Sequence, residues 1–198
     1  MSQIIELILN EEEILSGVDA ISIVGSPAIE RDFIALNKEP LELAKADGER
    51  KILLGAALVP NKMIFRKRGE EEFYVYFSKD TIKRVSELFL TKGNQNQATL
   101  EHEVKLHGLS VVESWIVEDA DKDKSNLYNM SLPVGSWVVA MKVYNDEVWD
   151  DYIKTGKVKG FSIEGYFANK VNMADETTEE DKQLEEVRAI FNQVLNQL

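Results

Sequence analysis

Ser162, His102 and His107 are the side chains of this sequence best suited to hydrolytic chemistry. The chain has only these two histidines, and an imidazole is the most accessible general base near neutral pH. Ser162 stands in the segment GFSIEGYF, which lacks the GxSxG pattern of a nucleophile elbow and so disfavours an α/β-hydrolase. On local pattern alone, a serine between Phe and Ile in a strand is more often structural than reactive.

The neighbours of these residues limit how they could cooperate. If residues 101–107 form a strand, His102 and His107 point to opposite faces, so at most one of them lines a given site. Glu164 follows Ser162 by two residues, so both side chains would share one face of a strand. Glu164 is then either a carboxylate beside a reactive serine or an ordinary exposed charge.

The sequence does not favour metal chemistry. It has no cysteine, which removes thiolate ligands, thiolate nucleophiles and disulfides. Its two histidines are five residues apart, whereas the HExxH zinc motif needs a spacing of four. The acidic segment 118–126 begins like a calcium loop, but Lys124 replaces the turn glycine and Met130 replaces the final glutamate. We therefore expect neither a metal nor a cofactor.

Composition and charge restrict the partners of the chain. It has 198 residues, 44% of them hydrophobic, and a formal charge of −12, which fits a folded chain whose surface repels phosphate. The basic run 62–68 is followed at once by three glutamates, which favours a solvated turn between strands over a binding patch. No apolar stretch reaches the ~20 residues of a membrane span, and no signal peptide is visible. We expect a cytoplasmic protein that binds neither nucleic acid nor membrane.

The candidate residues must be positioned by a fold that is rich in strands. Ser78 and Asn145 are suited to cap the only two helices expected before residue 172. Strands are predicted, from apolar and β-branched runs, over residues 3–9, 18–24, 31–36, 52–60, 63–68, 72–77, 101–108, 110–118, 136–144 and 160–168. Because no regular βαβ alternation occurs, the pattern predicts an α+β fold on a mostly antiparallel sheet or barrel.

The composition changes after residue 172. An acidic stretch leads into a capping box, and apolar residues then recur at 3-4-3-4 spacing over 184–198, which predicts a C-terminal amphipathic helix. We therefore divide the chain into a main domain, 1–172, and an acidic linker with a helical tail, 173–198. Two heptads are too few to be stable alone, so the tail should dock on the main domain, on a scaffold protein or on a second copy.

Several long segments in fixed order resemble a known phage family. They include SGVDAISIVGSPAIERDFIAL, LVPNKMIFRK, LEHE, VVESWIVEDADKDKS and LPVGSWVVAMKVYNDEVWDDYIKTGKVKGFSIEGYF, and the likeness extends over residues 14–168. The family is XkdF, whose members resemble serine proteases of the prohead maturation class. The resemblance implies a herpesvirus assemblin-like fold, a mostly antiparallel barrel with surrounding helices. It also implies action inside the procapsid in the host cytoplasm, on capsid and scaffold precursors.

The resemblance assigns roles to two residues. In the wider group of prohead proteases, a histidine precedes a serine that lies in an SIG-like strand, and His102 and Ser162 match these positions. Ser162 Oγ would attack the scissile carbonyl, while His102 would take the proton and return it to the leaving amine. His102 is preferred over His107 because the match lies in LEHE.

The third member of the implied triad is less clearly assigned. In the wider group the acid lies in a strand after the serine, whereas here the similar segment, DAISIVGSPA, lies near the N-terminus, as in a circular permutation. Strict alignment puts Ala20 at the acidic position, with Asp19 beside it, and a one-residue offset normally turns a strand side chain to the other face. The candidates for the acid are therefore Asp19 and the alternatives Glu164, Glu113, Glu101 and Glu103.

Two functions are consistent with these assignments. The first is a serine endopeptidase that cleaves scaffold and capsid precursors during head assembly. The second is a catalytically inactive assembly or virion protein that keeps the protease fold and acts through its helical tail. The absence of an acid in the expected register is the feature that favours the second.

Overall fold

The described residues form twelve β-strands and one full α-helix. The structure is a computed structural model, which describes residues 3–10, 16–28, 34–36 and 50–170. The strands are β1 Gln3–Ile8, β2 Gly17–Val24, β3 Ile34–Leu36, β4 Ile52–Leu58, β5 Ile64–Arg68, β6 Glu71–Phe77, β7 Ala98–Leu100, β8 Val104–Leu106, β9 Leu109–Ile116, β10 Trp137–Val143, β11 Gly160–Tyr166 and β12 Ala168–Asn169. The helices are α1 Lys79–Thr91 and α2 Asp146–Val148, with 3-10 turns at Asn94–Asn96 and Lys124–Tyr128 and a π-helical turn at Trp149–Ile153.

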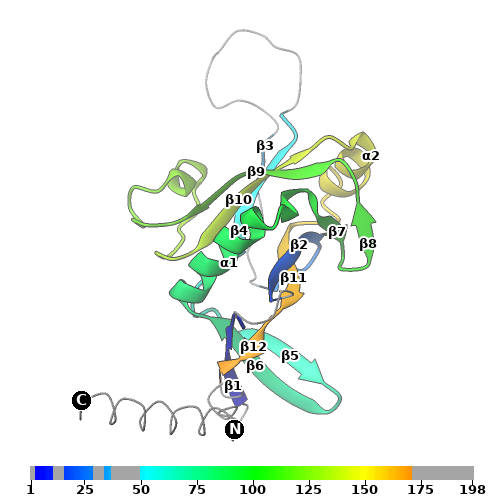
Figure 1. Cartoon of the computed structure of the whole chain (residues 1–198). Helices are drawn as coiled ribbons and strands as arrows, with labels where there is room; N and C mark the ends of the chain where they lie inside the picture. Colours follow the sequence, from blue (N-terminus) through cyan, green and yellow to red (C-terminus); the bar gives the residue numbers. More distant parts are fainter. Residues whose placement is uncertain (1–2, 11–15, 29–33, 37–49, 171–198) are drawn as a thin grey trace, which may run out of the picture.

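The strands form three four-stranded sheets. Their orders are β12-β1-β6-β5, β3-β4-β10-β9 and β11-β2-β7-β8, and the sheet that contains β11 and β2 lies beside α1 (Figure 1). Pairing is antiparallel except for β1 with β6 and β2 with β7, so the prediction of a mostly antiparallel α+β fold is confirmed. The prediction of a barrel is wrong, because each sheet keeps two edge strands and none closes on itself.

One buried core joins the three sheets. It contains Val75 from the first sheet, Trp137 from the second and Ile21 from the third, all with 3% of their surface exposed or less. Helix α1 packs against β2, β9 and β10, and the rings of Phe89 and Trp137 meet edge to face at 5.4 Å. Each such side chain contributes about 1.5–3 kcal/mol when fully buried, so the core fixes the position of β2 firmly.

The helix boundaries confirm the predicted caps. Ser78 Oγ accepts a hydrogen bond from the N–H of Thr81 at 3.4 Å, and α1 ends before Gly93, whose φ of +75° suits glycine. Among the described residues, no helix is long and apolar enough to span a membrane. The predicted C-terminal helix, 184–198, and the tail 173–198 lie outside the described residues.

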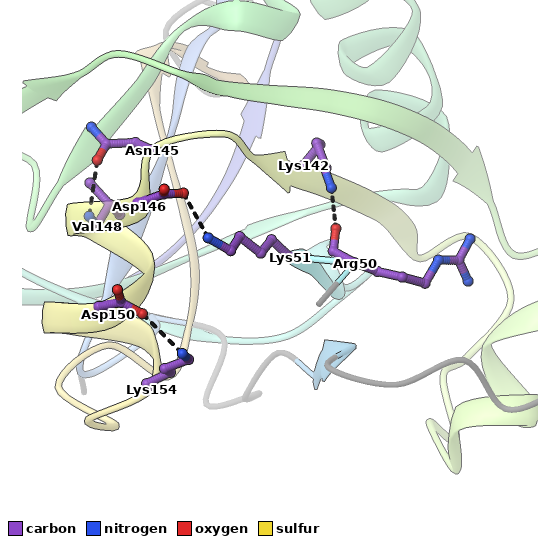
Figure 2. Close-up of polar contacts among 8 residues, drawn as sticks. All are labelled: Arg50, Lys51, Lys142, Asn145, Asp146, Val148, Asp150 and Lys154. Atoms are coloured by element: carbon purple, nitrogen blue, oxygen red, sulfur yellow. Dashed lines mark hydrogen bonds and ion pairs between the residues drawn. The ribbon is translucent and has the colours of Figure 1, made fainter. Parts of the chain in front are cut away.

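The second cap belongs to a region that we call the α2 corner, residues 145–154 together with Lys51. The side chain of Asn145 accepts a hydrogen bond from the N–H of Val148 at 3.1 Å, and Lys51 Nζ lies 2.7 Å from Asp146 Oδ1 (Figure 2). This short helix passes directly into the π-helical turn. The ion pair therefore attaches the start of α2 to the strand β4 that follows Lys51.

One predicted strand is wrong. The segment 101–108 was expected to be one strand, but residues 101–103 form a turn between β7 and β8, and only 104–106 are extended. Long-range pairing, which local sequence does not specify, decides this conformation. The strand predicted over 63–68 is confirmed, because residues 64–68 form β5, which pairs with β6, so the basic residues of this run lie on a strand and not in a turn.

Candidate active site

Three adjacent strands place a row of polar side chains on one face of the β11-β2-β7-β8 sheet. In the register of the sheet, Ser162 lies directly opposite Ser22, and Ser22 pairs in turn with Thr99 on β7. Glu164 lies opposite Ala20. Because alternate residues of a strand share a face, Ser162 and Glu164 project to the same side, about 7 Å apart along β11. The predicted sharing of a face by these two side chains is therefore confirmed.

His102 reaches this face from a turn whose backbone is strained. Glu101 and His102 have φ values of +51° and +62°, a left-handed conformation that costs a non-glycine residue roughly 1–2 kcal/mol. The N–H of Glu103 donates to the carbonyl of Leu100 at 3.0 Å, which closes the turn. Strain of this kind is concentrated at functional sites, where surrounding structure holds it in place. We call residues 101–103 the histidine turn.

Hydrogen bonds to strand β2 and its C-terminal end hold the histidine turn against the sheet. The N–H of His102 donates to Ser22 Oγ at 3.0 Å, and the N–H of Glu101 donates to the carbonyl of Ile23 at 3.1 Å. The carboxylate of Glu101 accepts a further bond from the N–H of Gly25 at 2.7 Å. At about 0.5–1.5 kcal/mol each, these bonds offset the backbone strain.

The imidazole of His102 contacts Glu164. His102 Nδ1 lies 3.1 Å from Glu164 Oε1, and the hydroxyl of Thr99 donates to the same carboxylate oxygen. A carboxylate accepts hydrogen bonds, so this contact favours the tautomer with a proton on Nδ1, in which Nε2 is the acceptor. The side chains of His102 and Glu164 are 42% and 29% exposed, which leaves the imidazole accessible to a substrate.

Ser162 lies on the same face as this pair and retains an unused hydroxyl. It is 7% exposed, and among the described residues its hydroxyl makes no hydrogen bond. Ser22, its partner across the strands, is the residue that binds the backbone of His102. Serine, imidazole and carboxylate thus lie together on one sheet face, and their catalytic roles remain predictions.

The other predicted carboxylates lie elsewhere. Asp19 lies at a β-bulge, because the partners of Glu164 and Gly165 on β2 are Ala20 and Val18, and no hydrogen bond among the described residues joins it to His102. Glu113 lies on β9, in a different sheet, and pairs with Lys124. His107 is exposed, and its backbone carbonyl accepts a hydrogen bond from the side-chain amide of Asn145 at 3.2 Å. Of the candidates for the acid, Glu164 is the one that the structure brings to His102.

Sequence reasoning missed two residues of this site, Ser22 and Thr99. Ser22 is fully buried, and its hydroxyl also donates to the carbonyl of Thr99 at 3.4 Å. A serine within the apolar run AISIV was the available signal, because a buried hydroxyl requires a hydrogen-bond partner. The identity of that partner depends on strand pairing that the sequence does not reveal.

A small cavity opens beside Ser162. Its volume is about 150 Å³, and β11 contributes Ser162 to its wall together with Phe161, Ile163 and Gly165, which alternate to the other face of the strand. Consecutive strand residues point to opposite faces, so a cavity that touches both lies along the edge of β11. Among the described strands, β11 pairs only with β2, so β11 has one unpaired edge. The cavity lies along this unpaired edge. A group bound in the cavity would therefore lie next to the serine.

Comparison with known proteins agrees with the chemistry of the site. A serine, a histidine and a carboxylate on one surface are characteristic of serine hydrolases. Residues 41–172 match the family described as "Putative phage serine protease XkdF", and the chain belongs to this family. The match includes His102, Ser162 and Glu164 but not Asp19. No curated protein and no solved structure is significantly similar to the chain.

Proposed function

We propose that the protein is a serine endopeptidase in which Ser162 is the nucleophile, His102 the general base and Glu164 the orienting acid. The observation that carries this proposal is the 3.1 Å contact between His102 Nδ1 and Glu164 Oε1, on the face that bears Ser162. The family to which the chain belongs supports peptide-bond hydrolysis as the reaction.

The three residues would act in the order of a catalytic triad. Ser162 Oγ adds to the scissile carbonyl carbon while Nε2 of His102 takes the hydroxyl proton, and the same proton passes to the leaving amine when the C–N bond breaks. Water then attacks the acyl-serine with His102 again as the base, which releases the carboxylic acid product and restores the hydroxyl. Glu164 holds the Nδ1–H tautomer and stabilises the imidazolium that forms in each step.

Capsid and scaffold precursors are the substrates that we propose, with cleavage inside the procapsid of a phage-infected cell. Membership in a phage protease family supports this setting. Ala20, where the likeness to prohead proteases would place the acid, lies directly opposite Glu164. A carboxylate on either strand would thus approach the same place, because opposed residues have Cβ atoms only about 5 Å apart.

The test is cleavage of the phage's own capsid and scaffold precursors by the purified protein. We expect defined fragments from the wild type, and a loss of several orders of magnitude in rate for Ser162→Ala. Ser125→Ala is the matched control, since Ser125 is also buried but lies in the 3-10 turn at Lys124–Tyr128, far along the chain from the site. Equal cleavage by wild type and Ser162→Ala would exclude Ser162 as the nucleophile.

A further inference from the structure

The cavity beside Ser162 is apolar except for one cation. Its walls include Leu58, Ile64, Phe77, Phe161 and Phe167. Arg66, on β5, is the one charged residue that lines it. A cavity of about 150 Å³ has room for a molecule the size of benzene, and so for one side chain of about six non-hydrogen atoms.

Arg66 differs from the two other cations on its strand. Lys67 pairs with Glu72, and Arg68 pairs with Glu71, each at 3.6 Å. Arg66 Nη1 instead donates to the carbonyl of its neighbour Phe65 at 3.0 Å, and no carboxylate among the described residues pairs with it. The basic run 62–68 therefore contains one arginine that lines a cavity and has no carboxylate partner among the described residues.

The surroundings of Arg66 favour binding of an anion. Part of the side chain is exposed, while burial of the rest lowers the pKa of the guanidinium. Arginine nevertheless remains charged in proteins, so the desolvated charge is stabilised by a carboxylate that can accept two parallel hydrogen bonds.

We propose that this cavity binds an acidic side chain of the substrate adjacent to the scissile bond, and that Arg66 is the specificity-determining residue. The apolar walls contact the methylene groups of a glutamate or aspartate, and the guanidinium contacts its carboxylate. Because Ser162 is part of the same wall, occupation of the cavity brings the neighbouring peptide bond to the nucleophile. This inference rests on the proposed function, since it names the substrate class of the same site.

The experiment is digestion of a peptide library by the wild type, with the new termini identified by mass spectrometry. We expect Glu or Asp to be enriched at one position flanking the cleaved bond. Matched peptides with Glu or Gln at that position should differ in kcat/KM by about tenfold to a hundredfold, the range expected for a charge-assisted bidentate pair. Cleavage without any acidic preference would overturn the inference and leave the proposed function intact.

Variants of β5 assign the preference to one residue. Arg66→Gln should remove the preference for Glu over Gln. Arg66→Lys should keep part of it, because lysine retains the positive charge but cannot form two parallel hydrogen bonds to a carboxylate. Arg68→Gln is the matched control, since it removes an arginine from the same strand that already has a partner. Thermal unfolding establishes that each variant folds. A preference that survives Arg66→Gln would contradict the assignment.

A binding measurement separates the inference from the proposed activity. The Ser162→Ala protein is titrated with a peptide that ends in Glu and with its Gln analogue. We expect tighter binding of the Glu peptide, and loss of the difference when Arg66→Gln is added. If the wild type cleaves nothing but this difference is found, the proposed function fails and the acidic site stands. If the two peptides bind alike, the inference fails.

Discussion

The histidine turn and the α2 corner both attach a loop to the end of a sheet through polar contacts, but they differ in what remains unused. In the α2 corner Asp146 pairs with Lys51, Asp150 pairs with Lys154 at 3.0 Å, and Asn145 caps the helix with an ordinary φ of −85° (Figure 2). These contacts satisfy charged groups on exposed surface, and Lys51, with a φ of +47°, is the one non-glycine residue of the corner with a left-handed backbone. Such a region needs no function beyond attachment.

The histidine turn has the opposite character. Two consecutive residues are left-handed, and their strain is offset by hydrogen bonds to β2 and its end. The arrangement nevertheless leaves Nε2 of His102 and the hydroxyl of Ser162 without partners in the described structure. A site that keeps reactive groups unpaired and fixes them with strained backbone is preorganised for a ligand. The comparison teaches that unused hydrogen-bonding capacity, not polarity, distinguishes the two regions.

Removal of the carboxylate contact at the histidine turn should have the largest effect. Glu164→Gln preserves the size of the side chain but no longer stabilises the imidazolium, and it allows the wrong tautomer of His102. We expect kcat to fall by about 10²–10⁴-fold, with KM little changed. Steady-state cleavage of a peptide substrate measures both constants.

Asp19→Asn is the matched control for this prediction. Asp19 was the first candidate for the acid, but it lies at a β-bulge of β2, and among the described residues the carboxylate that contacts His102 is that of Glu164. We expect its variant to retain activity close to that of the wild type. If Asp19→Asn is inactive and Glu164→Gln is active, the acid assignment moves to Asp19.

Removal of the hydroxyl that holds the histidine turn should have an intermediate effect. Ser22→Ala leaves the N–H of His102 without its acceptor, which should lower the free energy of unfolding by about 1–3 kcal/mol. Because the histidine turn then loses one of its attachments to β2, kcat should fall at least about tenfold. Urea denaturation gives the stability, and peptide cleavage gives kcat.

Ser136→Ala provides the comparison for Ser22→Ala. Ser136 is equally buried, and its hydroxyl donates to the carbonyl of Pro133 at 2.7 Å, outside the candidate site. Both variants should be destabilised, while only Ser22→Ala should lose activity. Equal activity in the two variants would show that Ser22 supports the fold alone and does not position the histidine.

The smallest effect should come from the α2 corner. The hydrogen bond and the charge of Lys51 lower the pKa of Asp146 below its usual value. A carboxyl group whose pKa is lower in the folded state stabilises the fold above its unfolded pKa, and this stabilisation is lost as the pH falls through the folded pKa. The wild type should therefore lose slightly more thermal stability than Asp146→Asn between pH 6 and about pH 2, with no difference in activity at pH 7. Identical pH profiles would show that the exposed ion pair contributes nothing measurable.

The part of the site that lies on one strand could be predicted from the sequence. Ser162 and Glu164 share a face because alternation along a strand is a local property. The caps at Ser78 and Asn145 were also local, since each depends on a side chain and an N–H three residues away.

The part of the site that depends on pairing between distant strands could not be predicted. His102 was expected in a strand, yet its left-handed backbone depends on Ser22 and Gly25, nearly 80 residues earlier in the chain. The prediction of a closed barrel was wrong for a similar reason. The alternation of apolar and polar residues along a strand does not determine whether the first and last strands of a sheet pair with each other. The sequence likewise does not show which cations of β5 have carboxylate partners. The pairing of β5 with β6 brings Glu72 to Lys67 and Glu71 to Arg68, while Arg66 has no such partner among the described residues.

The pairing of Ser162 with Ser22 also determines when the site can exist during the life of the chain. The two residues are separated by 162 − 22 = 140 positions, so nearly the whole described chain lies between them. During synthesis β2 emerges among the first strands and β11 among the last, and the histidine turn can bind β2 well before the nucleophile is present. A chain still attached to the ribosome therefore has the histidine turn without Ser162, and the activity that we propose would have to wait for the final strands.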